Sequence, residues 1–174
     1  SDHPACACPV IAAFVRSLND GLSGRKRTRL LLPLLPEIVD SLSTPQVEGR
    51  RTWMVTDWTI RKSTPAWFKF GSMRSLDRHA TALATLPEIV DLKRFGTAMP
   101  VIRAALEAAL EVGNIWAARA AEHAMGNLIG GSFSIDLPSH LTNFTINGHF
   151  TEPILSELRN SAVALIERMV KAGT

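Results

Sequence analysis

The sequence predicts an all-α fold. We expect a single domain over residues 1–174, a helical bundle of about six to eight helices with a short irregular or β-hairpin insertion near residues 130–152. Apolar residues recur every three to four positions along most of the chain, which is the period of an amphipathic helix. Thr-Pro pairs stand where helices would begin. Of the 174 residues, 46% are apolar and 20% are charged, as in a globular domain with one core.

The individual helices follow from this period and from start and stop residues. In chain order they are expected at residues 10–18, 23–33, 36–42, 45–62, 65–70, 75–85, 97–128 and 153–171. Pro33 and Pro36 lack an amide donor, so they should break or bend the second helix. Thr44-Pro45 and Thr64-Pro65 each combine a capping hydroxyl with a proline at the first helical position. Asn147-Gly148 lies between β-formers and predicts the hairpin turn.

A hexapeptide, LPEIVD, occurs at Leu35–Asp40 and again at Leu86–Asp91. The recurrence suggests a pseudo-repeat of two helix–break–helix units, residues 23–62 and 74–129, that would pack related faces against a shared core. Chance is the alternative, because two copies do not establish a repeat architecture.

The charge pattern favours neither a nucleic-acid partner nor a membrane. The formal net charge is +3, and the densest basic run is Gly24–Arg29. That run suits a solvated helix start as well as phosphate contacts, and no RNA-binding aromatic signature or zinc-finger spacing accompanies it. The apolar run at residues 5–15 is too short to span a bilayer and has no basic leader before it. We therefore expect a cytoplasmic protein.

A weak metal motif lies near the start of the chain. His3, Cys6 and Cys8 follow a His-x-x-Cys-x-Cys pattern that could supply three ligands. A structural zinc site normally has a second ligand pair, and the chain contains only these two cysteines. The two thiols could instead form a redox-active disulfide, or they could be small apolar residues that lead into a helix. No metal or other cofactor is expected.

Three of the four tryptophans lie between residues 50 and 68, among charged residues. At helical spacing, Trp53, Asp57 and Arg61 share one stripe, which places Asp57 one turn from Arg61. The stripe could form a pocket with aromatic walls and an orienting ion pair. Most tryptophans at such spacing belong to a core, so the structural interpretation is favoured. The candidate ligand-binding residues are Trp53, Trp58, Arg61, Trp67 and Trp116.

Two sets of residues could carry catalysis or bind a metal. His123 lies on the apolar face of the longest expected helix, and with Asp57 it could form an acid–base pair. A core histidine bonded to a neighbour is the more common case. The irregular segment holds Asp136, His140 and His149, which could bind a divalent metal or lie on a surface lid.

The chain resembles an alanine-rich family of uncharacterised helical proteins from actinobacteria. The resemblance rests on DHPACACPVIAAFVRSLND, on STPQVEGRRTWMVTDWTIRKSTPAWF and on LRNSAVALIERMV. It breaks down at residues 130–153, where the relatives continue an Ala/Trp-rich helix and this chain turns irregular. The resemblance implies an all-α fold, and because the family has no known activity it assigns no functional residue.

No phosphate-binding loop, dinucleotide fingerprint, GxSxG or HExxH motif occurs. The first hypothesis is therefore a helical protein that binds a small, largely apolar molecule in an aromatic-lined pocket. The second is a cofactor-independent isomerase or cyclase of a biosynthetic pathway. The third is a protein-interaction or homo-oligomerisation module, which predicts an apolar stripe exposed on a helix.

Overall fold

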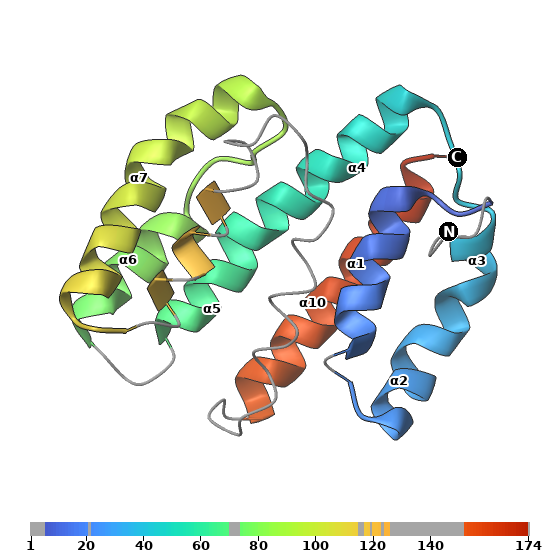
Figure 1. Ribbon diagram of the computed structural model, residues 1–174, viewed down its shortest axis with the longest axis horizontal. Helices are drawn as coiled ribbons and strands as arrows, with labels where there is room; N and C mark the ends of the chain where they lie inside the picture. The colour runs from blue at the N-terminus through green and yellow to red at the C-terminus, as the bar shows by residue number, and fades with distance from the viewer. Residues whose placement is uncertain are drawn as a thin grey trace. The chain divides into compact units, whose positions relative to one another are not determined.

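The computed structural model describes residues 6–20, 22–69, 74–114, 117–118, 120–122, 124–125 and 152–173. In this part of the chain every regular element is a helix, so the all-α prediction is confirmed (Figure 1). The hairpin turn expected at Asn147-Gly148 lies outside the described residues. Among the helices that are described, none is both long and apolar enough to cross a membrane.

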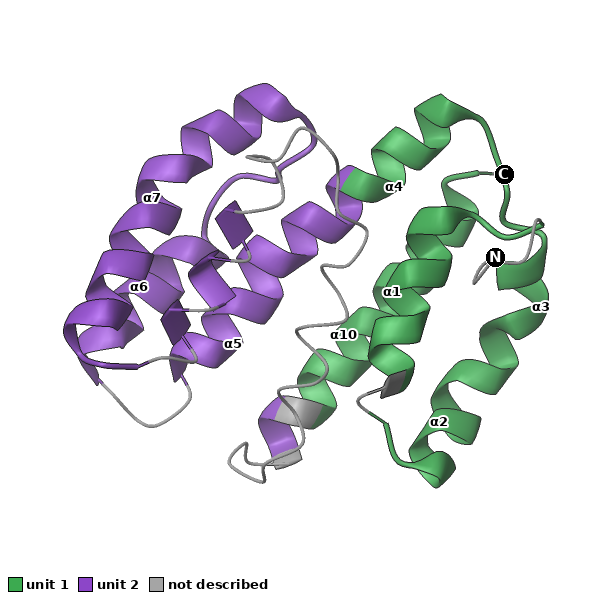
Figure 2. Cartoon of the chain, in the orientation of Figure 1, with its two compact units in different colours: residues 1–52, 135–148, 155–174 green, residues 53–134, 149–154 purple. Residues whose placement is uncertain are grey.

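The helical elements divide into two compact units (Figure 2). In chain order they are α1 (Pro9–Asp20), α2 (Gly24–Leu31), η1 (Leu32–Leu34), α3 (Leu35–Val39), α4 (Pro45–Trp58), η2 (Thr59–Ser63), α5 (Thr64–Lys69), α6 (Arg74–Ala84), α7 (Leu92–Glu111) and α10 (Glu152–Lys171). Unit 1 contains the described residues of 6–52 and 155–173. Unit 2 contains those of 53–125 and 152–154, so the boundary falls inside α4.

Prolines divide the second helical segment of unit 1, as the sequence predicts. Pro33 lies in the first turn of η1, a 3-10 helix, and Pro36 lies in the first turn of α3. A proline is tolerated there because the first amides of a helix have no helical acceptor. The segment α2–η1–α3 therefore continues in one general direction with two changes of helical geometry (Figure 1).

Two hydrogen bonds donated by backbone amides connect the residues just before α1 to those just after α3. The Cys8 amide donates to Ser41 Oγ at 3.0 Å, and the Leu42 amide donates to the Cys6 carbonyl at 3.2 Å. Since α1 and α2 are joined by a short turn at their other ends, α1 lies antiparallel to the α2–η1–α3 segment (Figure 1). The buried apolar residues of unit 1 include Ile11, Phe14, Leu18, Leu31, Leu34, Ile38, Ala162, Leu165, Ile166 and Met169.

The prediction of separate helices on either side of Thr64 was wrong. The helix continues from α4 through η2, a π-helical turn, into α5. Thr64 is helical, with φ −58° and ψ −48°, and both its amide and its hydroxyl donate to the Thr59 carbonyl, the hydroxyl at 2.8 Å. The wider π turn accommodates Pro65, which cannot donate to the preceding turn. The hydroxyl thus bonds back along the helix instead of capping a new one.

Helix α7 begins earlier than the sequence predicts. The capping residue is Asp91, whose carboxylate accepts the Arg94 amide at 2.7 Å, and not a residue of the segment Thr97–Pro100. Pro100 lies inside the helix instead of at its start. An aspartate that accepts an amide three residues later stabilises a helix start by about 1 kcal/mol, and here that cap overrides the proline signal.

Helix α7 also ends within the range that was expected to be one helix, 97–128. Gly113 has φ +67°, a left-handed conformation that favours glycine. Its amide donates to the Leu110 carbonyl at 3.0 Å, and the Asn114 amide donates to the Ala109 carbonyl at 2.9 Å. These two bonds form a Schellman motif, which satisfies carbonyls at a helix end. The Asn114 side chain then accepts the Ala117 amide at 3.0 Å and caps the helical residues that follow.

The core of unit 2 comes mainly from η2, α5, α6, α7 and the helical residues 117–118, 120–122 and 124–125. Its buried residues are Ile60, Phe68, Leu76, Ala80, Leu83, Ile89, Phe95, Ala98, Ile102, Ala105, Ala109, Ala117, Ala118, Ala121 and Ala124. Eight of these fifteen are alanines, whose small side chains allow helices to approach closely. The two copies of LPEIVD fall in different units and differ in structure: Leu35–Asp40 contains α3, whereas Leu86–Asp91 is the non-helical connection between α6 and α7.

Candidate functional site

The described tryptophans all lie in unit 2 and contribute to its packing. Trp67 of α5 is only 4% exposed, and Trp53 of α4 is half-buried against the core of the unit. Trp58, also half-buried, precedes η2. Trp116 lies outside the described residues. The positions of Trp53 and Trp67 agree with the structural interpretation of this stripe, in which the rings form part of a core.

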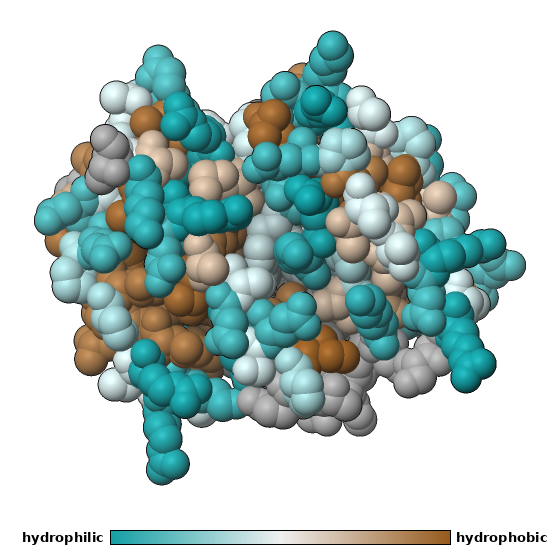
Figure 3. Space-filling view, turned by 180° about the vertical axis from the view of Figure 1, so that it is seen from behind, coloured by the Kyte–Doolittle hydropathy of each residue, from teal (hydrophilic) through white to brown (hydrophobic). Residues whose placement is uncertain are grey.

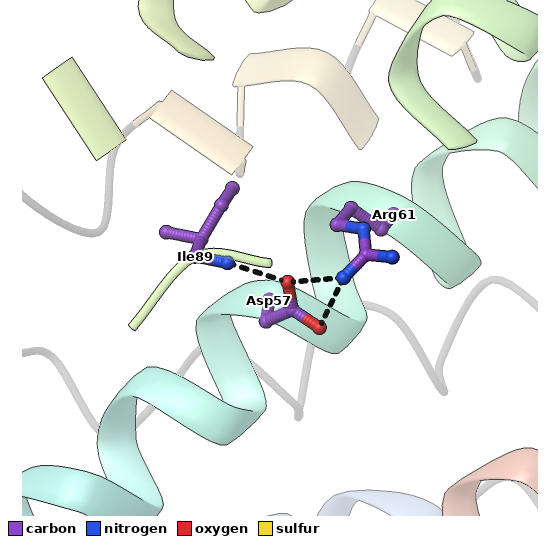
Figure 4. Close-up of polar contacts among 3 residues, drawn as sticks. All are labelled: Asp57, Arg61 and Ile89. Atoms are coloured by element: carbon purple, nitrogen blue, oxygen red, sulfur yellow. Dashed lines mark hydrogen bonds and ion pairs between the residues drawn. The ribbon is translucent and has the colours of Figure 1, made fainter. Parts of the chain in front are cut away.

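Asp57 and Arg61 form the ion pair that their spacing predicts (Figure 4). Arg61 Nη1 donates to Asp57 Oδ1 at 3.1 Å and to Oδ2 at 3.4 Å, and the Ile89 amide donates to Oδ1 at 2.9 Å. The carboxylate therefore holds the α6–α7 connection against the end of α4. Its lone pairs are engaged by two donors, which suits an anchor better than a general base. The proposed partner, His123, lies outside the described residues, so the enzyme hypothesis stays a prediction.

Arg61 has one further polar atom of interest. Its Nε is buried and makes no hydrogen bond, although its side chain as a whole is 26% exposed. Arg61 lies in the π-helical segment η2, about one turn after Trp58. Because Asp57 also accepts the Ile89 amide, the Asp57–Arg61 pair is interpreted as a structural contact.

Arg51 is a buried cation that the sequence analysis did not single out. Its side chain is 1% exposed, and its Nε donates to the Met169 carbonyl at 2.7 Å. Its Nη1 donates to the Ser41 carbonyl at 2.6 Å, while Nη2 reaches the Val170 carbonyl at 3.5 Å. Two of these carbonyls belong to the last turn of α10, where a positive charge is favoured by the helix dipole. Arg51 therefore caps α10 and joins it to α4 and to the α3–α4 connection within unit 1.

The N-terminal thiols lie in different surroundings. Cys6 is exposed and Cys8 is fully buried, and both are free thiols. His3 lies outside the described residues, as do Asp136, His140 and His149. Within the described ranges, no group of three His, Cys, Asp or Glu side chains could hold a metal ion.

A groove lies in unit 1, between α1 and the α2–η1–α3 segment. Its volume is about 420 Å³, within the range of small-molecule sites. The apolar lining residues are Ala7, Ala12, Val15, Leu31, Leu32, Leu35, Ile38 and Val39, and the polar ones are Arg16, Asn19, Arg27 and Thr28. We call this feature the α1–α3 groove. It was not predicted, and neither Trp53, Trp58 nor Trp67 lines it.

Apolar side chains at the edge of the α1–α3 groove are unusually exposed. Leu32 is 56% exposed, Leu35 43% and Val39 43%, whereas Leu31 and Ile38 beneath them are buried. Figure 3, which shows the side opposite to Figure 1, has hydrophobic surface gathered over this part of unit 1, with hydrophilic side chains around it. A contiguous apolar surface of this kind marks a binding or interaction site more often than single exposed leucines do.

Comparison of the chain with protein-family models, with curated proteins and with solved structures finds no match. The geometry and chemistry of the α1–α3 groove are therefore the basis for a functional proposal.

Proposed function

We propose that the protein binds a small, largely apolar molecule in the α1–α3 groove. The observation that supports this most is the combination of an apolar floor, formed by Leu31 and Ile38, with leucine and valine side chains left exposed along the edge. A ligand that covers them removes apolar surface from water on both partners, at about 25 cal/mol per Å². The proposed ligand class is the one expected from the sequence. The proposed site, however, lies in unit 1 and not at the tryptophans of unit 2.

The expected affinity follows from the apolar surface that a ligand buries in the groove. A ten-carbon chain that is half-buried gains about 4 kcal/mol, since each fully buried methylene contributes about 0.8 kcal/mol. That gain alone corresponds to a dissociation constant of about 1 mM. Binding in the micromolar range therefore requires either deeper burial or polar contacts at one end of the ligand.

The test is a titration with N-phenylnaphthylamine, an uncharged dye whose fluorescence rises in apolar surroundings. Leu32→Gln should weaken dye binding about threefold to fivefold, because it removes about 1 kcal/mol of apolar contact at the groove edge. Leu110→Gln is the matched control: Leu110 is 57% exposed against 56% for Leu32, but it lies on α7 of unit 2. Equal loss in both variants, or no binding by the unchanged protein, would reject the proposal.

A second candidate is self-association, because the exposed apolar residues of this surface follow helical spacing. Leu32, Leu35 and Val39 are all at least 43% exposed and step by three and four positions along η1 and α3. This is the kind of stripe that an interaction module presents. Sedimentation velocity over a range of protein concentrations distinguishes the two candidates. A dimer that Leu32→Gln converts to a monomer would assign the surface to a second copy of the chain, whereas a monomer at all concentrations leaves the groove to a ligand.

A further inference from the structure

The two ends of the α1–α3 groove differ in chemistry. One end, where α1 starts and α3 ends, is lined by Ala7, Ala12, Leu35 and Val39. The other end lies at the α1–α2 turn and is lined by polar side chains, namely Arg16, Asn19, Arg27 and Thr28. Because α1 lies antiparallel to the α2–η1–α3 segment, the four polar residues gather at the turn although they come from two helices. The groove is therefore amphipathic along its length.

Arg27 is exposed at the polar end and makes two long contacts there. Its Nη2 reaches the Asn19 carbonyl at 3.4 Å and the Leu22 carbonyl at 3.3 Å, both at the end of α1. These contacts use one nitrogen of the guanidinium, and no carboxylate among the described residues pairs with the others. The guanidinium offers a planar donor pair that matches a carboxylate or phosphate.

The surrounding charge is positive. Arg16 and Arg27 are the charged residues among the described groove lining, and neither aspartate nor glutamate joins them there. Arg25, Lys26 and Arg29 lie on the same helix as Arg27, and the sequence from Gly21 to Pro36 contains four cations and no acidic residue. A second copy of the chain would bring the same positive charge to this end, whereas an anionic ligand would be attracted to it.

We infer that the groove takes a single-chain amphiphile with an anionic head group, its apolar chain lying along Leu35 and Val39 and its head group on Arg27. This rests on the proposed function and specifies its ligand class. A carboxylate or a phosphate monoester satisfies the same donors, so the shared requirement is a compact anion joined to an unbranched apolar chain. The charge-assisted contact adds to the affinity that the half-buried chain provides.

The test compares decanoate, decyl phosphate and uncharged decanol as competitors of N-phenylnaphthylamine on the full chain, at low ionic strength. The anionic compounds should bind about fivefold more tightly than the alcohol, the size of a favourable exposed charge pair. Arg27→Gln should abolish this preference. Arg29→Gln removes the same charge from the same helix at a position outside the groove lining, and it should retain the preference.

The outcomes separate the two proposals. Displacement of the dye by all three compounds with equal affinity would overturn the head-group inference and leave the proposed function standing. Failure of all three to displace the dye, or failure of the dye itself to bind, would overturn the proposed function. An anion preference that survives Arg27→Gln would show that Arg27 does not hold the head group. The ratio of decanoate to decyl phosphate affinity then identifies which anion the site takes.

Discussion

Replacement of Arg51 by methionine should destabilise unit 1 strongly. Methionine retains much of the apolar stem, but it leaves the carbonyls of Met169 and Ser41, now bonded at 2.7 and 2.6 Å, without a donor in a buried site. Each such bond to a charged donor contributes about 1.5–3 kcal/mol. The contact to Val170 at 3.5 Å is at the limit of a hydrogen bond and adds little. The expected loss is therefore about 3–5 kcal/mol, a large part of the 5–15 kcal/mol typical of a domain.

The assay is urea unfolding followed by far-UV circular dichroism, together with amide hydrogen exchange in the last turn of α10. Arg51→Lys should lose about half as much, since one ammonium group cannot reach carbonyls on both α10 and the α3–α4 connection. Arg50→Met is the matched control, because Arg50 is the exposed neighbour of Arg51 on the same helix. A change within about 0.5 kcal/mol for Arg51→Met, equal to that of a surface substitution, would refute the assignment of Arg51 as the cap of α10.

Three further predictions concern unit 2 and the helix α4. Asp57→Asn should lower stability by about 1 kcal/mol in thermal unfolding, because the ion pair is lost while an oxygen acceptor remains; no change would show that the pair is dispensable. The pKa of His79 is lowered from its usual 6.5, first by partial burial and then by the positive charge of Arg78. The folded state therefore binds this proton more weakly than the unfolded state, so the stabilisation by His79 is complete above pH 6.5 and is lost as the pH falls through the lowered pKa. An NMR titration of the imidazole at or above 6.5 would contradict this. Gly113→Ala should destabilise by about 1 kcal/mol because of the positive φ, whereas Gly49→Ala, inside α4 with open space around its Cα, should stabilise by about 0.5–1 kcal/mol; equal effects would refute the conformational argument.

The features that the sequence predicted correctly depend on local physics. The division of the second segment at Pro33 and Pro36 follows from a missing amide donor, and the Asp57–Arg61 pair follows from one turn of helix. Both signals act within about four residues. They require no knowledge of which helix packs against which.

The corrected boundaries arise where two local signals compete. Thr64-Pro65 resembles a helix start, but the π turn of η2 absorbs the proline and the helix continues. Near α7, Asp91 and the pair Thr97–Pro100 both resemble starts, and the cap at Asp91 prevails. The end of α7 at Gly113 also had a local signal, because glycine is followed there by asparagine. The alanine-rich apolar pattern continues on both sides of this signal, so the sequence predicted one continuous helix.

The features that the sequence did not predict depend on contacts between distant segments. Arg51 bonds to Met169, 118 residues away, so helical spacing around Arg51 gave no indication of its acceptors. The α1–α3 groove exists because α1 lies antiparallel to α2–η1–α3 and leaves Leu32 and Leu35 partly uncovered. The apolar spacing of Leu32 and Leu35 predicts that they pack against another helix. In the structure, the other helices of unit 1 leave both side chains partly exposed.

The proposed binding of an apolar ligand in the α1–α3 groove of unit 1 can be tested by mapping amide chemical shifts of the ¹⁵N-labelled protein as decanoate is added. We expect saturable shifts concentrated in α1, α2, η1 and α3, strongest near Val15, Leu35 and Val39 along the groove. Shifts centred on Trp53 and Trp67 in unit 2 would contradict it, and so would the absence of any saturable change.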